Sequence, residues 1–339
     1  MKKQLEQPFE YLKRKDGSAF APETVKHWYE ARAYVLDRLK TVAIGPNSKE
    51  HLHAVVTGDS PLMLSVVRQL ALSAHYPNYD ENTGRNRTVI TLVSKNEHII
   101  DELKKEEYLC NLPDYCQYTY IDIELQIVTE WHGEDEGALI MSEEDVKAFL
   151  STKNEKEIYW IDTRKAVLAD RIYSLGAVID NLPDEDIHCA GRYILALDVF
   201  RGLLRKKAKP LINEQKWSND QIRVRNGLSN ICSADCYELK SEEIGEENNE
   251  AYSISEHARW VTEKLIMGFR SMNKEERIHD ERLFDEAKKQ YRNKLKKNPA
   301  DPVHVDICSY AELRRIDPES LKYDSFLMLA IKYILKRVR

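Results

Sequence analysis

Leu52-His-Ala-Val-Val-Thr57 is a short apolar, β-branched run, and Gly58-Asp-Ser-Pro61 follows it at once. Such a run is typical of a buried strand in a parallel sheet. Ser60 suits the N-cap of a helix and Pro61 its first turn, and apolar residues recur at helical spacing over residues 62–74. The stretch therefore predicts a buried strand, a tight turn and an amphipathic helix.

Strand and helix patterns alternate on both sides of this stretch. We expect helices at 21–40, 97–109, 143–150, 163–175 and 189–207, and strands at 87–93, 118–126, 157–162 and around 236–239. Repeated strand–helix units predict a parallel sheet with right-handed crossovers. The expected fold class is therefore α/β, with a helical lead at 1–50 and a Rossmann-like parallel-sheet domain at 51–241. Residues 52–162 should hold at least four parallel strands, with Gly58 in the first strand-to-helix turn.

Composition limits the classes of partner. The net charge of -6 and the pI near 6.0 argue against a dedicated nucleic-acid-binding protein, which usually carries a basic domain. No apolar stretch is long enough for a transmembrane helix, and the charged N-terminus has no apolar core behind it, so neither a membrane span nor a signal peptide is predicted. The six cysteines include no C-x-x-C pair. We therefore expect no metal site, and reduced thiols as in the cytoplasm.

The turn after the first strand is where a Rossmann-type domain cradles a phosphate. Here Ser60 and Met63 stand where a full fingerprint has glycines, and Asp59 brings negative charge. Ser94-Lys-Asn96 follows the second strand, in place of the usual ribose-binding acid. The arrangement resembles the TrkA-N type of Rossmann module in outline. Two interpretations stay open: a nucleotide-type ligand bound at Gly58, Asp59, Ser60 and Lys95, or a purely structural sheet with a solvated Lys95.

Two aspartates lie on the predicted strands. Asp162 ends the strand expected at 157–162, at the carboxyl edge of the sheet, and Asp122 lies within the strand expected at 118–126. Paired carboxylates at such an edge could serve acid–base chemistry or hold Mg²⁺. The alternative is that one caps the next helix and the other faces solvent. Asp162 is kept as a candidate ligand residue.

The most specific motif lies in the C-terminal quarter of the chain. His257 and Trp260 share one helix face, and after them come Gly268-Phe269, His304, Tyr310, Leu313 and Lys322-Tyr-Asp324. This order resembles the RyR-type repeat, the small helical module named after ryanodine receptors and also found in bacterial proteins. The resemblance covers residues 255–336 and implies a small, mainly helical RyR-like domain at 251–339, after an acidic linker at 242–250.

The chain departs from the family pattern in two ways. A charged, helical segment is inserted at 281–297, and Val305 and Ser309 stand where the family has prolines.

Trp260 admits two interpretations. It either packs in the module's core with Leu265, Phe269, Tyr310, Leu313 and the apolar residues at 326–334, or it stacks on a nucleotide base. In the second case Tyr310 could stack as well, and nearby basic residues would meet phosphate. The candidate ligand residues of the module are His257, Arg259, Trp260, Lys264, Arg270 and Tyr310.

Basic residues also cluster at 288–297 and in the tail at 332–339. They could contact a polyanion, but without interleaved aromatic residues a solvated helix face is the prediction.

No nucleophile–base set and no metal cluster emerges, so no catalytic residue is predicted. Bacterial RyR-like repeats coupled to Rossmann modules look like sensor parts of signalling or defence systems. The leading hypothesis is a cytoplasmic ligand-sensing or regulatory protein that binds a nucleotide-derived small molecule, as a homo-oligomer or with a partner protein. The alternatives are an NAD(P)-dependent enzyme, which the incomplete glycine pattern counts against, and a ligand-free assembly protein.

Overall fold

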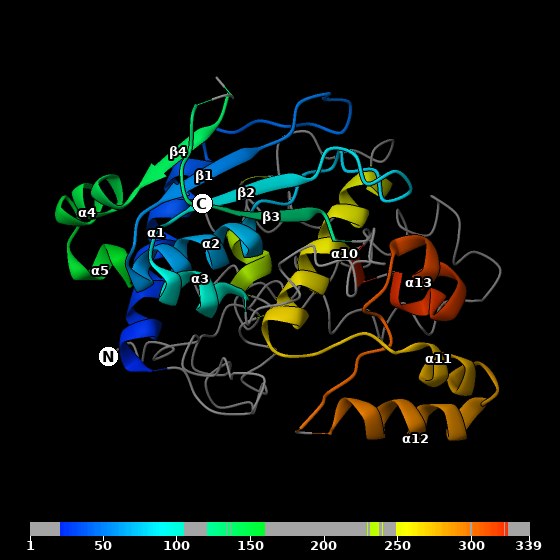
Figure 1. Cartoon of the computed structure of the whole chain (residues 1–339). Helices are drawn as coiled ribbons and strands as arrows, with labels where there is room; N and C mark the ends of the chain where they lie inside the picture. The colour runs from blue at the N-terminus through cyan, green and yellow to red at the C-terminus, as the bar shows by residue number, and fades with distance from the viewer. Residues whose placement is uncertain are drawn as a thin grey trace, which may run out of the picture.

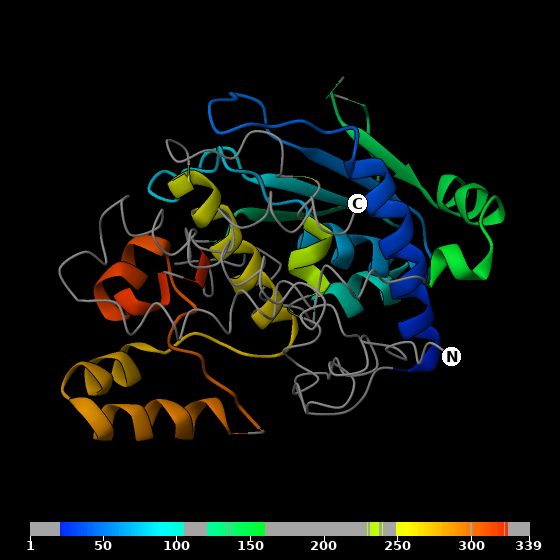
Figure 2. The ribbon, with the colours of Figure 1, turned by 180° about the vertical axis from the view of Figure 1, so that it is seen from behind.

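The computed structural model describes residues 21–104, 121–133, 135, 137–159, 229, 231–236, 239, 249–298, 300–321, 323 and 324. Its N-terminal part contains α1 (Pro22–Leu39), β1 (His53–Thr57), α2 (Pro61–Ser73), β2 (Thr88–Val93), α3 (Glu97–Lys104), β3 (Ile123–Val128), β4 (Leu139–Ser142), α4 (Glu143–Ser151) and α5 (Glu155–Ile158). Its C-terminal part contains α10 (Asn249–Ile266), α11 (Lys274–Glu281), α12 (Asp285–Lys296), α13 (Tyr310–Ile316) and the 3₁₀ turn η3 (Pro318–Ser320) (Figure 1). Both Figure 1 and the view from behind in Figure 2 place α11 and α12 at the end of the molecule away from α4 and α5.

The sheet has four strands, all parallel, in the order β3-β2-β1-β4. Val55 of β1 lies between Thr91 of β2 and Ile140 of β4. The chain adds β2 and β3 on one side of β1 and then returns to add β4 on the other. The carboxyl ends of β1 and β4 therefore meet where the strand order reverses, which is the usual place of a ligand in an open α/β sheet. The predicted α/β class, the four parallel strands and the turn at Gly58 are confirmed.

The fourth strand is not the one predicted. Residues 157 and 158 belong to α5, which begins with a reciprocal capping box between Asn154 and Glu157. Residues 160–162, including Asp162, lie outside the described part of the chain. The strand is instead β4, whose four residues pair with β1. A run this short carries almost no periodic signal of its own, so its pairing with β1 determines its conformation.

Other predictions differ at their boundaries. Residues 231–236 and 239 are helical, so the strand expected around 236–239 is wrong. Tertiary contacts override the local pattern there, because Asp235 forms an ion pair with Arg32 of α1 and Ser233 donates to Glu256 of α10. α12 confirms a helix within 281–297. The segments expected as helices at 163–175 and 189–207, the apolar residues at 326–334 and the basic tail at 332–339 lie outside the described residues.

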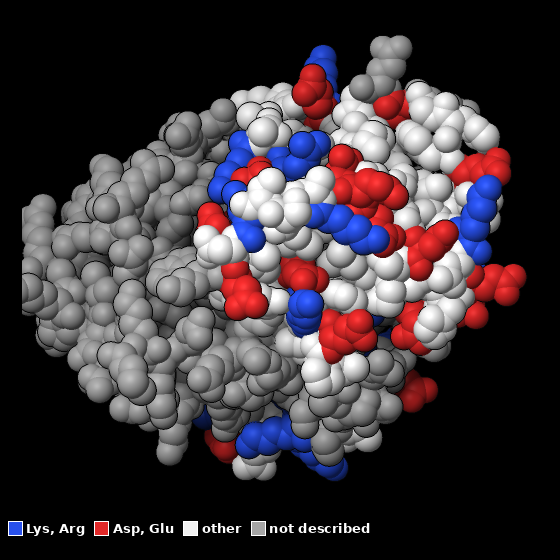
Figure 3. All heavy atoms as spheres, turned by 90° about the vertical axis from the view of Figure 1, so that its left-hand side faces the viewer, with Lys and Arg blue, Asp and Glu red and all other residues white. Residues whose placement is uncertain are grey.

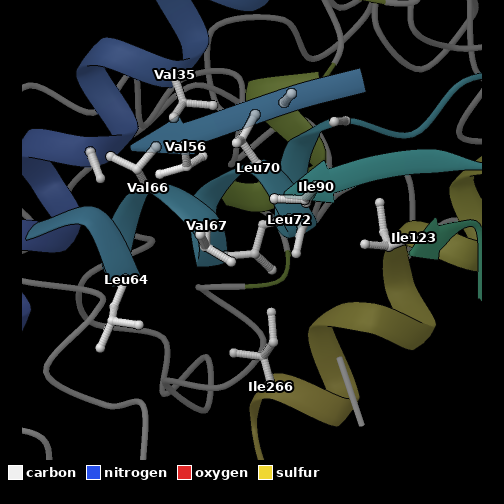
Figure 4. Packing of buried hydrophobic residues seen from close by; sticks show 14 of the residues in the cluster. Val35, Val56, Leu64, Val66, Val67, Leu70, Leu72, Ile90, Ile123 and Ile266 are labelled. Carbon is white, nitrogen blue, oxygen red and sulfur yellow. The ribbon is translucent and has the colours of Figure 1, made fainter. Parts of the chain in front are cut away.

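The core is centred on α2, in which residues 62–73 are all buried. Val66 and Leu70 of α2 join Val35 of α1, Ile90 of β2 and Ile266 of α10 in one hydrophobic cluster (Figure 4). Complete burial of a side chain such as that of Leu70 contributes about 1.5–3 kcal/mol. Because α10 contributes to this cluster, the sheet and the first helix of the C-terminal part share one core.

A loop of the sheet part also holds α13. Glu81, between α2 and β2, accepts hydrogen bonds of 2.8 Å from the backbone N–H groups of Tyr310 and Ala311. The Ser309 hydroxyl accepts a further bond from the N–H of Glu312. These donors at the start of a helix have no partner within the helix. Glu81 therefore links the sheet part to the C-terminal part at a second place.

The surface of the sheet part carries both signs of charge. On the face that includes α4 and α5, acidic and basic side chains are interspersed (Figure 3). Among the described residues on that face, basic side chains alternate with acidic ones and do not gather into one broad positive area. None of the described helices is long and apolar enough to cross a bilayer.

Candidate functional site

We use the name sheet edge for the carboxyl ends of β1, β2 and β4 with the residues that follow them. Gly58 in this edge has a φ of +150°, and a Cβ there would lie 2.8 Å from Oε2 of Glu143 and 2.8 Å from Cγ of Met63. Both the backbone conformation and the available space therefore require glycine. Glu143, the first residue of α4, is the group that lies this close to Gly58.

Asp59 points to the turn after β2. Its carboxylate accepts a hydrogen bond of 2.6 Å from the Ser94 hydroxyl, and bonds of 3.0 and 3.2 Å from the N–H groups of Lys95 and Asn96. The bond from Ser94 is the main cause that lowers the pKa of Asp59. The Lys95 side chain reaches away to Glu130, with 3.0 Å between Nζ and Oε1. Asp59 and Lys95 thus both bind groups of the protein itself.

Glu143 fills the anion position of the sheet edge. One of its carboxylate oxygens is 2.6 Å from Nζ of Lys147, while the other lies over Gly58. The hydrogen bond from Lys147 lowers the pKa of Glu143, and the Ser60 hydroxyl and the N–H of Asp59 act in the same direction. The start of α2, where the helix dipole and free N–H groups attract an anion, therefore already faces a carboxylate.

Asp122 lies at the opposite end of the sheet. It directly precedes β3, and its carboxylate is 2.8 Å from Nδ1 of His75, with both side chains buried. The prediction that Asp122 lies within the strand is wrong, because the strand begins one residue later and the carboxylate is bonded near the end of α2. Asp162, the other carboxylate of the expected pair, lies outside the described residues. Among the described residues, no group of three or more His, Cys, Asp or Glu side chains could hold a metal ion.

A line of hydroxyl, imidazole and carboxylate, which the sequence did not suggest, joins β1 and β2. Nδ1 of His53 is 2.8 Å from Oδ2 of Asp135, and its Nε2 is 2.9 Å from Oγ1 of Thr91. The same groups act as nucleophile, base and orienting acid in hydrolases. Thr91 is completely buried, however. Its hydroxyl also donates to Oε1 of Gln126 at 3.3 Å, so protein groups already occupy it on both sides, and the line ties the loop before β4 to the sheet.

Arg259 and Lys264, expected to meet phosphate, are bonded to acids of their own helix. Arg259 is completely buried and lies 2.8 Å from Glu256 and 2.9 Å from Glu263. Lys264 is 2.8 Å from the other oxygen of Glu263. The buried charges neutralise each other inside the protein, as buried ion pairs must.

Arg270 is also paired, although it is partly exposed. Its guanidinium bonds Glu276 and Asp301, each with a shortest distance of 2.7 Å. These two carboxylates, Glu276 first, raise the pKa of Arg270 far above its usual range. A phosphate at Arg270 would have to replace one of them.

Trp260 is partly buried within a row of rings. His257 stacks on one side, with 5.9 Å between ring centroids, and His304 meets the indole edge-on at 4.9 Å. Nζ of Lys264 lies 5.4 Å from the indole centroid. Tyr310 is buried and contacts His257 edge-on. The geometry thus places Trp260 against protein groups on several sides.

His257 connects this row to the end of the described chain. Its Nε2 is 3.0 Å from the carbonyl oxygen of Cys308, and its Nδ1 is 3.2 Å from Oδ2 of Asp324. Burial opposes a charge on His257, but the hydrogen bond and attraction of Asp324 outweigh burial and raise the pKa. His257 therefore fastens three segments together.

A pocket of about 570 Å³ lies along α12; we call it the α12 pocket. Its lining residues on α12 are Asp285, Lys288, Lys289, Arg292, Asn293 and Lys296, and the others are Val303, His304, Val305, Asp306, Asp317 and Glu319. One wall is thus mainly basic, and the other combines apolar, imidazole and carboxylate groups. The volume lies within the range of small-molecule sites.

The cations of the basic wall are not equivalent. Arg292 binds the buried Asp280 through two bonds of 2.8 Å and also reaches Asp317, and Lys288 lies 3.6 Å from Asp280. Lys289 is exposed in the pocket wall. Lys296 is close enough to lower the pKa values of both His304 and Asp306.

The opposite wall contains a carboxyl group in an unusual state. Oδ1 of Asp306 is buried and has no hydrogen-bond partner among the described residues. Burial, and after it repulsion by Asp317, raises the pKa of Asp306 to about 6. Burial also holds the pKa of His304 well below its usual range. His304 is therefore neutral, and because its Nδ1 accepts the N–H of Asp306 at 3.3 Å, the ring proton is on Nε2.

The structure therefore brings Gly58, Asp59, Ser60 and Lys95 together at the sheet edge, and His257, Trp260, Lys264 and Tyr310 together around α10. None of these residues lines the α12 pocket, which sequence analysis missed, although His304 of the pocket wall contacts Trp260. The one available signal was the basic run at 288–297, interpreted as a solvated helix face. No protein-family model, curated protein or solved structure matches this chain.

Proposed function

We propose that this chain is a cytoplasmic ligand-sensing or regulatory protein that binds a nucleotide-derived small molecule, and that the α12 pocket receives it. The observation that carries the proposal is a basic wall in the same pocket as Asp306, whose buried Oδ1 has no hydrogen-bond partner among the described residues. The basic wall would bind a phosphate, and the carboxyl oxygen would accept a hydrogen bond from an N–H or O–H group of a base or sugar.

The sheet edge supports a ligand less well. A phosphate at the start of α2 would meet the carboxylate of Glu143, and Asp59 adds a second negative charge in the same turn. Like charges at such distances repel. In our proposal the parallel sheet is a Rossmann-like scaffold whose usual ligand position is filled by its own acid, which also disfavours the NAD(P)-dependent enzyme.

Contacts around the α12 pocket offer a route by which binding could be sensed. His304 in the pocket wall contacts Phe269, which belongs to the cluster that includes the sheet core, and Trp260, which packs against that cluster. Arg270 and Val303 also form a parallel bridge that holds the pocket segment beside the end of α10. A ligand that moves His304 would therefore press on α10. The proposed homo-oligomer or partner protein would respond to that change.

Calorimetry and thermal-shift assays test the proposal on the full chain. Mononucleotides and cyclic nucleotides should raise the melting temperature, because they bind the native state alone. Lys289→Gln should weaken binding, and more so at low than at high salt. Lys294→Gln is the matched control, since Lys294 lies on the same helix but does not line the pocket.

The outcomes separate the hypotheses. A response to NAD(P) alone, insensitive to Lys289→Gln, would favour the enzyme and move the site away from α12. No response to any nucleotide would favour the ligand-free assembly protein.

A further inference from the structure

The charge pattern of the α12 pocket restricts which nucleotide it can hold. A ligand made only of phosphates would satisfy α12 but would place negative charge beside Asp306, Asp317 and Glu319. The molecule that fits must carry its anionic group at one end and hydrogen-bond donors at the other. A nucleotide has this polarity, and its bases differ in the donors that they present.

Asp306 belongs to the wall of the pocket that does not come from α12, away from most of its basic side chains. Its neighbours in the pocket wall are Val305 and His304, an apolar side chain and a neutral ring. Such a surface suits the flat face of a base, while the lysines of α12 suit phosphate. A carboxylate accepts hydrogen bonds only, so it pairs best with an edge where two donors are adjacent.

Guanine presents such an edge, with N1–H beside the N2 amino group. Adenine and cytosine instead place a ring nitrogen acceptor next to their amino group, and uracil flanks its N–H with two carbonyl groups. An acceptor that faces a carboxylate is repelled. From this geometry we infer that the α12 pocket is selective for guanine nucleotides, with Asp306 as the residue that determines the base. The inference rests on the proposed function, because it assigns specificity to the same site.

The state of Asp306 should make the selection depend on pH. The charged groups that face it are Asp317 after α13, His257 on α10 and Lys296 and Arg292 on α12, with the neutral His304 on its own segment. Burial first, and then repulsion by Asp317, raise its pKa to about 6, although His257, Lys296 and Arg292 each act to lower it. Below that pH the protonated acid gains a donor and no longer discriminates against a base that offers an acceptor.

The experiment compares 3′,5′-cyclic GMP with 3′,5′-cyclic AMP by calorimetry, because the single phosphodiester charge of both stays constant between pH 5 and pH 8. At pH 7.5 we expect cyclic GMP to bind at least about tenfold more tightly than cyclic AMP. One well-placed contact to a base gives a discrimination of this size. This preference should shrink as the pH falls through about 6. Asp306→Asn replaces two acceptors with an acceptor and a donor, the pattern that suits adenine, and should reverse the preference.

Controls keep the possible failures apart. Glu319→Gln removes another carboxylate of the pocket wall and should leave the preference for guanine intact. Thermal melting checks that Asp306→Asn is folded. If both cyclic nucleotides bind equally and only Lys289→Gln weakens them, the proposed function stands and guanine selection is overturned. If ribose 5-phosphate shows the same dependence on Asp306 as cyclic GMP, the residue binds the sugar and the inference is also overturned. If no nucleotide binds, both proposals fail.

Discussion

The sheet edge and the α12 pocket both bring carboxylates and basic side chains together, but they leave the carboxylates in different states. At the sheet edge, Asp59 and Glu143 each accept bonds from neighbouring groups, and both have lowered pKa values. In the α12 pocket, Asp306 has a raised pKa and a buried oxygen that no group in the described part of the chain bonds. An acid bonded within the chain stabilises the fold, whereas a buried acceptor without a donor costs free energy that a ligand can recover.

The largest effect should come from Arg259, a residue first expected to bind ligand. Arg259→Gln leaves Glu256 and Glu263 buried without their shared guanidinium, and should destabilise the protein by about 3–5 kcal/mol. Urea unfolding measures this loss. If the urea midpoint is unchanged but nucleotide binding is lost, Arg259 binds the ligand instead of stabilising the fold. The ligand site would then include α10, and the comparison of the sheet edge with the α12 pocket would leave it out. Lys274→Gln, an exposed lysine of α11, serves as the control.

The second prediction concerns Gly58. Gly58→Val places a branched side chain at φ +150°, within 3 Å of Glu143 and Met63. Strain and overpacking together should cost roughly 2–4 kcal/mol. The sheet edge should therefore lose stability even without any ligand, as thermal melting would show. A variant as stable as the parent would mean that the turn has free space for a phosphate.

Local sequence patterns were sufficient for the part of the fold where each element buries its own apolar face. α1, β1, α2 and β2 follow from their periodicity and from Gly58 and Pro61. β4 does not, because its four residues become a strand only by pairing with β1. The helix at 231–236 depends likewise on Arg32 and Glu256, which are distant in sequence.

The site was harder to predict for a related reason. The sequence pointed to Gly58 and the start of α2, but it could not show that the carboxylate of Glu143, far along the chain, lies over that turn. The state of Asp306 depends on Lys296, Asp317 and His257, which come from separate segments. A basic run can be recognised in the sequence, but whether it faces solvent or a pocket depends on what packs opposite.

The third prediction follows from the raised pKa of Asp306. An acid whose pKa is higher in the folded than in the unfolded state contributes a penalty that grows as the pH rises from its usual value near 4 to about 6. At pH 7 the penalty is about 2–3 kcal/mol. Asp306→Asn removes it, so the variant should be more stable than the parent at pH 7, and the difference should vanish near pH 4. Equal stability at both pH values would show that Asp306 is satisfied, like the acids of the sheet edge.

The smallest effect tests the sheet edge by removing its internal anion. Glu143→Ala takes a carboxylate from the start of α2 and from its bond with Lys147, at a cost of about 1 kcal/mol. The exposed N–H groups and the helix dipole would then attract an anion from solution. Sulfate should therefore stabilise the variant more than the parent when both are melted in sulfate and in chloride at equal ionic strength. Lys147→Ala is the control, since it leaves the carboxylate in place. If sulfate stabilises parent and variant equally, Glu143 does not occupy an anion position, and the sheet edge would again compete with the α12 pocket as the place where a phosphate binds.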